Sequence, residues 1–158
     1  FVEYICDKAK GKPILLSTGM NDIKSIKRTI NCMKKYNSLY GILQCTSIYP
    51  TPYNMVRLGV LEGLRYIFPN VPIGLSDHTM DIYTSLGAVA LGASIIEKHF
   101  TSDKHWSGPD MAVSIDPQEL NELIVGANAI YSARGGEKSI LDEELPTKEL
   151  RQKWFKRE

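Results

Sequence analysis

The sequence predicts an α/β fold in which short parallel strands are covered by helices. Short, fully apolar runs alternate along the chain with segments whose apolar residues recur every three or four positions. Strands that are apolar throughout are typical of a parallel sheet, and each parallel connection is usually made by a helix. The 158 residues, 43% of them hydrophobic, are enough for one domain with its own core.

The first two units each pair an apolar strand with a helix. Residues 14–16 form a strand that ends in Ser17-Thr18-Gly19, and a helix with apolar residues at helical spacing follows. Residues 41–45 form the next strand, and a turn with two prolines leads into a second helix. The apolar positions of the two helices are Ile23, Ile26, Ile30 and Met33, then Val56, Val60, Leu64 and Ile67.

Two more strands and two more helices complete the pattern. We expect strands over 71–75 and 93–98, with a helix of small residues over 83–91 between them. The last helix has the most complete start signal, because Asp116, Pro117 and Glu119 supply an N-cap, a first-turn proline and a capping-box acid. Its apolar stripe is Leu120, Leu123, Ala127 and Ile130, and Gly135-Gly136 are expected to stop it.

Four such units are compatible with two architectures. A doubly wound open sheet suits a chain of this size, whereas a complete TIM barrel needs eight units and typically about 250 residues. Length alone therefore favours the open sheet.

Composition excludes several classes of partner. With 19 basic and 18 acidic residues, the formal net charge of +1 gives no electrostatic footprint for nucleic acid or an anionic membrane. The three cysteines are widely spaced and odd in number, which argues against a disulfide framework. With no signal-peptide pattern, we expect a cytoplasmic protein that acts on a small molecule.

The strongest candidate site is a pair of histidines at neighbouring strand ends. His78 closes the third predicted strand and His99 closes the fourth, so one strand-helix unit separates them. Functional groups gather at the carboxyl ends of parallel strands. Two neutral imidazoles there suit one divalent ion with positions left open for water or substrate, although each ring is equally compatible with a hydrogen-bonded strand end.

Other polar residues near the strand ends have weaker signals. Asp110 is placed to act as a base, a sugar-hydroxyl acceptor or a ligand, and is equally a turn residue. Ser17 and Thr18 precede a helix start, where hydroxyls can hold an anion. Of Glu97 and Lys98, at most one faces a barrel interior. Ser47 and Tyr49 flank Ile48 just past a strand, so both side chains can point to the same side. His105 and Trp106 lie in a polar loop, where they either gate substrate access or are surface rings.

Taken together, several linked motifs resemble the sialic acid synthases, the family of N-acetylneuraminate, legionaminate and pseudaminate synthases. The match runs in order over residues 12–150. The matching stretches are KPILLSTGM, LQCTSIYPTP, PIGLSDHT, LGAVALGASIIEKHFT and GPD, followed by RGGEK and LPTK.

The resemblance implies a partial TIM barrel that contains strands five to eight with their helices. It divides the chain into a lead-in helix or linker (1–11), half of the catalytic barrel (12–135) and a connector (136–158). Family members condense phosphoenolpyruvate with an N-acetylated sugar aldehyde, such as N-acetylmannosamine, to give a nine-carbon sialic acid and phosphate.

By the same resemblance, His78 and His99 bind a divalent ion, Mn²⁺ or Mg²⁺ with Co²⁺ as a further possibility, and act in catalysis with Asp110. Ser17 and Ser76 contact phosphoenolpyruvate, and Tyr49 and Asp110 contact the sugar. Ser47, also assigned to substrate binding, replaces an Asn frequent in bacterial members, so the acceptor sugar stays open.

The family pattern also predicts what this chain lacks. Its first four strands supply a glutamate and lysines to the phosphoenolpyruvate pocket, and an antifreeze-like domain contributes an arginine across a homodimer. We therefore expect the isolated chain to bind metal weakly and not to turn over. Two other classes stay open: a non-catalytic α/β binding or assembly module, and a metal-dependent TIM-barrel hydrolase or aldolase.

Overall fold

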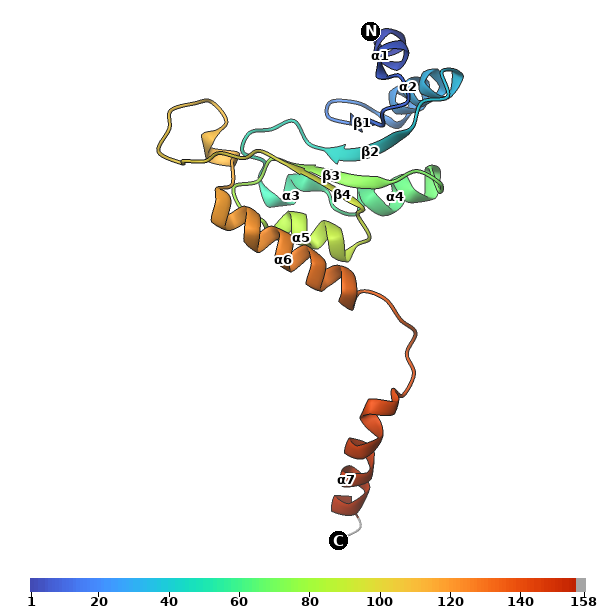
Figure 1. The fold of residues 1–158 in the computed structure, drawn as a ribbon, viewed down its shortest axis with the longest axis vertical. Coiled ribbons are helices and arrows are strands. Elements are labelled where there is room, and N and C mark those ends of the chain that lie inside the picture. Colours follow the sequence, from blue (N-terminus) through green and yellow to red (C-terminus); the bar gives the residue numbers. More distant parts are fainter. Residues whose placement is uncertain (156–158) are drawn as a thin grey trace.

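A computed structural model describes residues 1–155 as one four-stranded sheet with helices packed on it (Figure 1). The α/β prediction is confirmed. The helices are α1 (Val2–Ala9), α2 (Ile23–Lys35), α3 (Tyr53–Val56), α4 (Val60–Ile67), α5 (Tyr83–Ala90), α6 (Pro117–Ala133) and α7 (Leu145–Phe155), with 3₁₀ turns η1 (Met111–Val113) and η2 (Asp142–Glu144). The strands are β1 (Ile14–Ser17), β2 (Tyr40–Cys45), β3 (Ile73–Asp77) and β4 (Ile95–Lys98).

The order of the strands decides between the two architectures. All pairs are parallel and the strands lie in the order of the sequence, β1-β2-β3-β4. A doubly wound sheet reverses its order at a switch point, and this sheet does not. Because right-handed crossovers that all run in one direction put every helix on the same face, the arrangement is half of a barrel. The open sheet favoured by length was wrong, because length carries no information about strand order.

The main core lies between the sheet and its helices. From the sheet, Ile42, Ile73 and Leu75 are at most 2% exposed and pack against α2, α4 and α5. Four of the buried helical residues come from the predicted stripes, whereas Leu61 and Ala88 do not, and Leu61 is buried where the stripe had Val60. The buried helical members are Ile26, Ile30, Val56, Leu61, Leu64 and Ala88.

The opposite, concave face of the sheet carries a second apolar layer. In the register, Leu15 lies beside Gly41, and Leu43 beside Gly74, which pairs with Ile95. Side chains of this kind fill the interior of a complete barrel. Leu43 is fully buried here, whereas Leu15 is 48% exposed, so this layer is only partly covered.

Three expected boundaries needed correction. Strand β3 covers 73–77 rather than 71–75, and β4 begins at Ile95 rather than at residue 93. The helix expected to carry Val56 to Ile67 is two helices, because Arg57 is left-handed with a φ of 60° and ends α3. Apolar spacing alone does not detect such a break.

Helix α6 begins as predicted. The Asp116 carboxylate accepts from the Glu119 backbone N–H and the Glu119 carboxylate accepts from the Asp116 N–H, both at 2.9 Å, which completes the capping box. Leu123 is the buried member of its stripe. The helix ends at Ala133, two residues before the predicted glycines. It packs beside α5, and α7 lies away from the sheet beyond an extended segment (Figure 1).

No helix among residues 1–155 is both long enough and apolar enough to cross a membrane.

Candidate functional site

Three aromatic rings meet at the carboxyl end of the sheet. His78 follows β3, His99 follows β4, and Tyr49 comes from the loop after β2. The ring centroids of His78 and His99 are 5.3 Å apart, and the Tyr49 ring lies 4.1 Å from His78 and 5.7 Å from His99. The histidine pair expected from neighbouring strand ends is thus brought together, with Tyr49 against both rings.

His78 is held in a defined orientation. Its residue is only 6% exposed, and its Nδ1 lies 3.1 Å from the carbonyl oxygen of Thr46. Because a carbonyl oxygen only accepts, this contact places the ring proton on Nδ1 and leaves Nε2 with its lone pair. A histidine whose second nitrogen is fixed by a backbone carbonyl is the usual form of a metal-ligating histidine.

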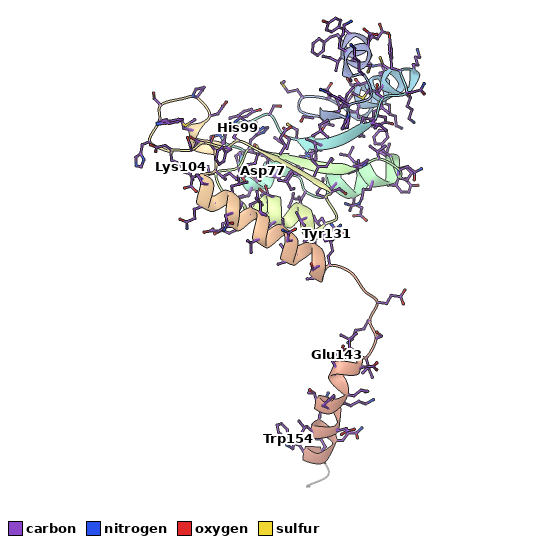
Figure 2. The ribbon with its side chains drawn as sticks, viewed as in Figure 1. Asp77, His99, Lys104, Tyr131, Glu143 and Trp154 are labelled. Carbon is purple, nitrogen blue, oxygen red and sulfur yellow. The ribbon has the colours of Figure 1, made fainter. Side chains whose placement is uncertain are left out.

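His99 lies beside the loop that carries Asp110 (Figure 2). Its Nδ1 is 3.8 Å from the Asp110 carboxylate, and the two side chains are 31% and 46% exposed. The loop returns to the sheet next to this pair, because the backbone N–H of Ile115 donates to the His99 carbonyl at 2.9 Å. Asp110 is therefore part of the same site, at its open side.

Glu97 joins two of the predicted substrate-binding serines on the concave face. Its carboxylate accepts a 2.6 Å hydrogen bond from the Ser76 hydroxyl, and the Ser17 hydroxyl lies 3.4 Å from the same oxygen. The predictions did not include Glu97 as a site residue. Strand alternation from His99 would have found it, because residues two apart on a strand face the same side.

Ser47 lies against the turn that follows β1. A side chain at Gly19 would overlap the Ser47 hydroxyl, and would come within 3.0 Å of the Cys45 thiol. The Ser47 hydroxyl is 3.9 Å from that thiol. Partial removal from water raises the pKa of the Tyr49 phenol above its ordinary value, and the nearby Cys45, Asp110 and Glu97 act in the same direction.

A buried ion pair lies behind the two histidines. Lys98 Nζ is 3.5 Å from the Asp77 carboxylate, and the side chains are 3% and 0% exposed. Burial alone would raise the pKa of Asp77. Hydrogen bonds from Ser85, Thr79 and Thr84, with the charge of Lys98, outweigh burial and hold that pKa below its usual value. Burial lowers the pKa of Lys98, partly offset by Asp77. Glu97 and Lys98 thus face opposite sides, as predicted.

Other polar residues with a predicted role lie outside the cluster. The Thr18 hydroxyl is buried and donates to the Leu43 carbonyl, and Asp22 already caps the start of α2. The Thr18 hydroxyl is thus engaged by the neighbouring strand, and a carboxylate already lies at the start of α2. His105 is 96% exposed and pairs with Asp103, and Trp106 is 60% exposed, so both are surface rings.

The histidine pair fits a divalent ion that takes further ligands from outside the protein. Metal–nitrogen distances of about 2.0–2.1 Å from one nitrogen of each ring are compatible with rings at this separation. Among residues 1–155, no group of three or more His, Cys, Asp or Glu side chains is arranged to hold a metal. The described residues thus place two imidazole rings, those of His78 and His99, at a separation that one divalent ion could span.

Known proteins with similar sequences share most of this chain. It is 38% identical over 141 residues to human N-acetylneuraminate-9-phosphate synthase, covering 89% of this chain and 37% of that protein. It is 44% identical over 127 residues to N,N'-diacetyllegionaminic acid synthase of Campylobacter jejuni, covering 78% and 38%. The chain therefore spans about two fifths of the length of these relatives.

A solved structure of a protein with a related name shares the fold. The crystal structure of an N-acetylneuraminic acid (sialic acid) synthetase from Leptospira borgpetersenii, in complex with citrate, matches with a TM-score of 0.85 and 33% identity. The match covers 96% of this chain and 52% of that one. The model of the NeuB family matches residues 1–139, which contain the sheet and the whole polar cluster. The chain belongs to the NeuB family.

Proposed function

We propose that this chain supplies the metal-binding and sugar-binding part of a sialic-acid-synthase-type enzyme. The complete enzyme would condense phosphoenolpyruvate with an N-acetylated sugar aldehyde to give a nine-carbon sugar acid and phosphate. The observation that carries the proposal is the assembly of Tyr49, His78, His99 and Asp110 at the carboxyl end of a half-barrel sheet. The names of the similar proteins support the same class of product.

The reaction joins two carbon skeletons and releases phosphate. Carbon 3 of phosphoenolpyruvate bonds to the aldehyde carbon, whose oxygen gains a proton and becomes a hydroxyl. Water adds to carbon 2, and the bond from carbon 2 to the phosphate oxygen breaks, so that phosphate leaves and a keto acid forms. Charge develops at the aldehyde oxygen and at carbon 2, and groups in the site must stabilise both.

His78 and His99 would hold the divalent ion, Mn²⁺ or Mg²⁺ with Co²⁺ as a further possibility. The ion would act as a Lewis acid toward the aldehyde oxygen. Since His78 Nδ1 is engaged by Thr46, its Nε2 is the nitrogen available for this purpose. The rigid backing of His78 would keep the aldehyde in one place during carbon–carbon bond formation.

The remaining residues would bind and orient the two substrates. Tyr49 would donate a hydrogen bond from its phenol to the sugar, and Asp110 at the open side would accept one from a sugar hydroxyl. Ser17 and Ser76, whose hydroxyls donate to Glu97, would turn those protons to phosphoenolpyruvate when it binds. Ser47, close to Gly19, would border the substrate on the β1 side.

The proposal also assigns the parts of the chain. Strands β1 to β4 would be the fifth to eighth strands of a TIM barrel, formed by residues 12–135. Residues 1–11 would lead into it and 136–158 would connect onward, with 156–158 lying outside the described residues. Groups from the other half-barrel would complete the phosphoenolpyruvate pocket, and the whole cytoplasmic enzyme would be a homodimer.

Phosphate release tests the proposal. A protein that carries this sequence with a complete barrel is incubated with phosphoenolpyruvate, N-acetylmannosamine and Mn²⁺, and acceptors of the legionaminate and pseudaminate type are tried in parallel. We expect acceptor-dependent release of phosphate, and loss of at least about a hundredfold in the His78→Ala/His99→Ala variant.

The matched control is His105→Ala, which removes an exposed ring from the same loop region and is expected to leave the rate unchanged. Lack of phosphate release with every N-acetylated acceptor would refute the synthase. Metal-dependent cleavage of a substrate without phosphoenolpyruvate would instead favour a hydrolase or aldolase that uses the same two histidines. The isolated chain should bind Mn²⁺ weakly and release no phosphate.

A further inference from the structure

The two histidines are backed by a continuous hydrogen-bonded network on the opposite side of the sheet. Asp77 immediately precedes His78, and Lys98 immediately precedes His99. These two residues are partners in the β3–β4 register. Because neighbouring residues on a strand face opposite sides, histidines that point into the concave face place Asp77 and Lys98 under the helices.

The network binds both the backbone N–H and the backbone carbonyl of Thr79. Asp77 accepts from the Thr79 backbone N–H at 2.9 Å, and Lys98 Nζ donates to the Thr79 carbonyl at 2.8 Å. The residue between Asp77 and Thr79 is His78. Hydrogen bonds therefore fix the backbone around His78. One of them comes from Lys98, the residue before His99.

Helix α5 secures the same carboxylate. The hydroxyls of Thr84 and Ser85 donate to Asp77 at 2.7 and 2.6 Å, and the Thr84 hydroxyl is 2.9 Å from that of Thr79. Asp77 and His99 are labelled in Figure 2 at this end of the sheet, where Asp77 is the register partner of Lys98. The residues Thr79, Thr84 and Ser85 are all buried.

A buried charge pair of this kind is poorly explained by stability alone. Bringing two charges out of water is costly, and well-packed apolar residues often stabilise the fold equally well. The Asp77–Lys98 pair does something that apolar residues cannot, because it connects two strand ends through directional hydrogen bonds. The strand ends that it connects are those that present His78 and His99.

We infer that Asp77 and Lys98 are positioning residues that set the spacing and orientation of the His78 and His99 rings. Their hydrogen bonds reach the backbone of Thr79 and not the rings, so they act through the backbone of residues 77–79 and 98–99. The inference rests on the proposed function insofar as the purpose of the spacing is to bind one divalent ion. The spacing itself is a property of the metal-free protein.

The test uses the full chain and the double variant Asp77→Asn/Lys98→Met. The asparagine keeps an acceptor for the Thr79 N–H, and the methionine keeps the volume of the lysine without its donor. Removing both charges together avoids leaving one charge buried and unpaired. Circular dichroism and urea unfolding establish that the double variant is folded.

The first readout is Mn²⁺ affinity, measured by titration with the metal alone. We expect the double variant to bind about 10- to 100-fold more weakly than the unmodified chain, which is the usual effect of losing an outer-shell partner. Lys104→Met, which breaks the exposed pair with Glu119, and Asp116→Ala, which destabilises a helix start, are expected to bind like the unmodified chain. The two controls separate repositioning from a general loss of stability.

The second readout needs no metal. Proton NMR of the unmodified chain should show contacts between the Tyr49 and His78 rings, whose centroids are 4.1 Å apart, and these contacts should weaken in the folded double variant. Retained ring contacts overturn the inference, whatever the metal titration shows. If the unmodified chain fails to bind Mn²⁺ but the contacts weaken as expected, the metal site fails and the positioning role stands.

Discussion

The close approach of β3 and β4 at Gly74 allows a prediction of opposite outcomes for two Gly→Ala substitutions. A methyl group at Gly74 would lie 2.7 Å from Leu43 Cδ2 and 2.8 Å from Ile95 Cβ, and closer still to the Ile95 carbonyl oxygen. Carbon atoms normally approach to about 3.5–4.0 Å, so the neighbours must move by about 1 Å. One of them is the backbone of the paired strand, which cannot rotate away.

The expected cost follows from these contacts. Overpacking a tight site costs about 1–3 kcal/mol, and weakening a ladder hydrogen bond adds about 1 kcal/mol, so Gly74→Ala should lower the free energy of unfolding by about 2–4 kcal/mol. For a chain of this length, that corresponds to a fall in Tm of about 5–15 °C. Gly63→Ala is the control, because this mid-helix glycine in α4 has nothing within 4 Å of an added methyl group.

Gly63→Ala should raise the free energy of unfolding by about 0.4–1 kcal/mol through the unfolded state and helix propensity. Urea unfolding followed by circular dichroism measures both variants, and an unchanged m-value shows that the transition is comparable. A Gly74→Ala variant as stable as the unmodified chain would refute the reasoning. It would mean that β3 and β4 separate at little cost, and that their register does not hold the two histidines together.

Two further substitutions test local features of the site's surroundings. Asp116→Ala removes the cap that accepts from the Glu119 N–H and should cost about 1 kcal/mol in urea unfolding. Gln118→Ala, at an exposed position in the same first turn, should change stability by less than about 0.5 kcal/mol. Equal stability of the two variants would contradict the capping box. In His105→Ala, carbon-13 NMR should show the pKa of Asp103 moving up while staying below its ordinary value, because the ring donor is lost but the backbone N–H of residue 105 still donates. An unmoved Asp103 titration would contradict the ring contact.

The candidate site could be predicted in part because its signals are local. Polar residues that end apolar runs must gather at the carboxyl edge if the strands are parallel, so His78 and His99 were predictable as a pair. Alternation also predicted that Glu97 and Lys98 face opposite sides. Alternation did not predict which of the two residues faces the barrel interior, because that depends on which side of the strand the helices cover.

Other parts of the site depend on contacts between residues far apart in the chain. The role of Asp77 comes from Lys98, Thr84 and Ser85, whose side chains reach it only after β3, β4 and α5 have packed. Thr18 looked available for an anion, but the neighbouring strand offers it the Leu43 carbonyl. Neither contact leaves a pattern in the nearby sequence.

The alternation of strands and helices, the capping box of α6 and the polar groups at strand ends could all be predicted, because each follows from the spacing of residues close in the chain. The strand order, the break between α3 and α4, and the face that each strand residue presents depend instead on long-range packing. Strand order in particular is a long-range choice. The order β1-β2-β3-β4 makes the sheet a half-barrel. It also brings the rings of Tyr49, His78 and His99 together at the carboxyl end of the sheet.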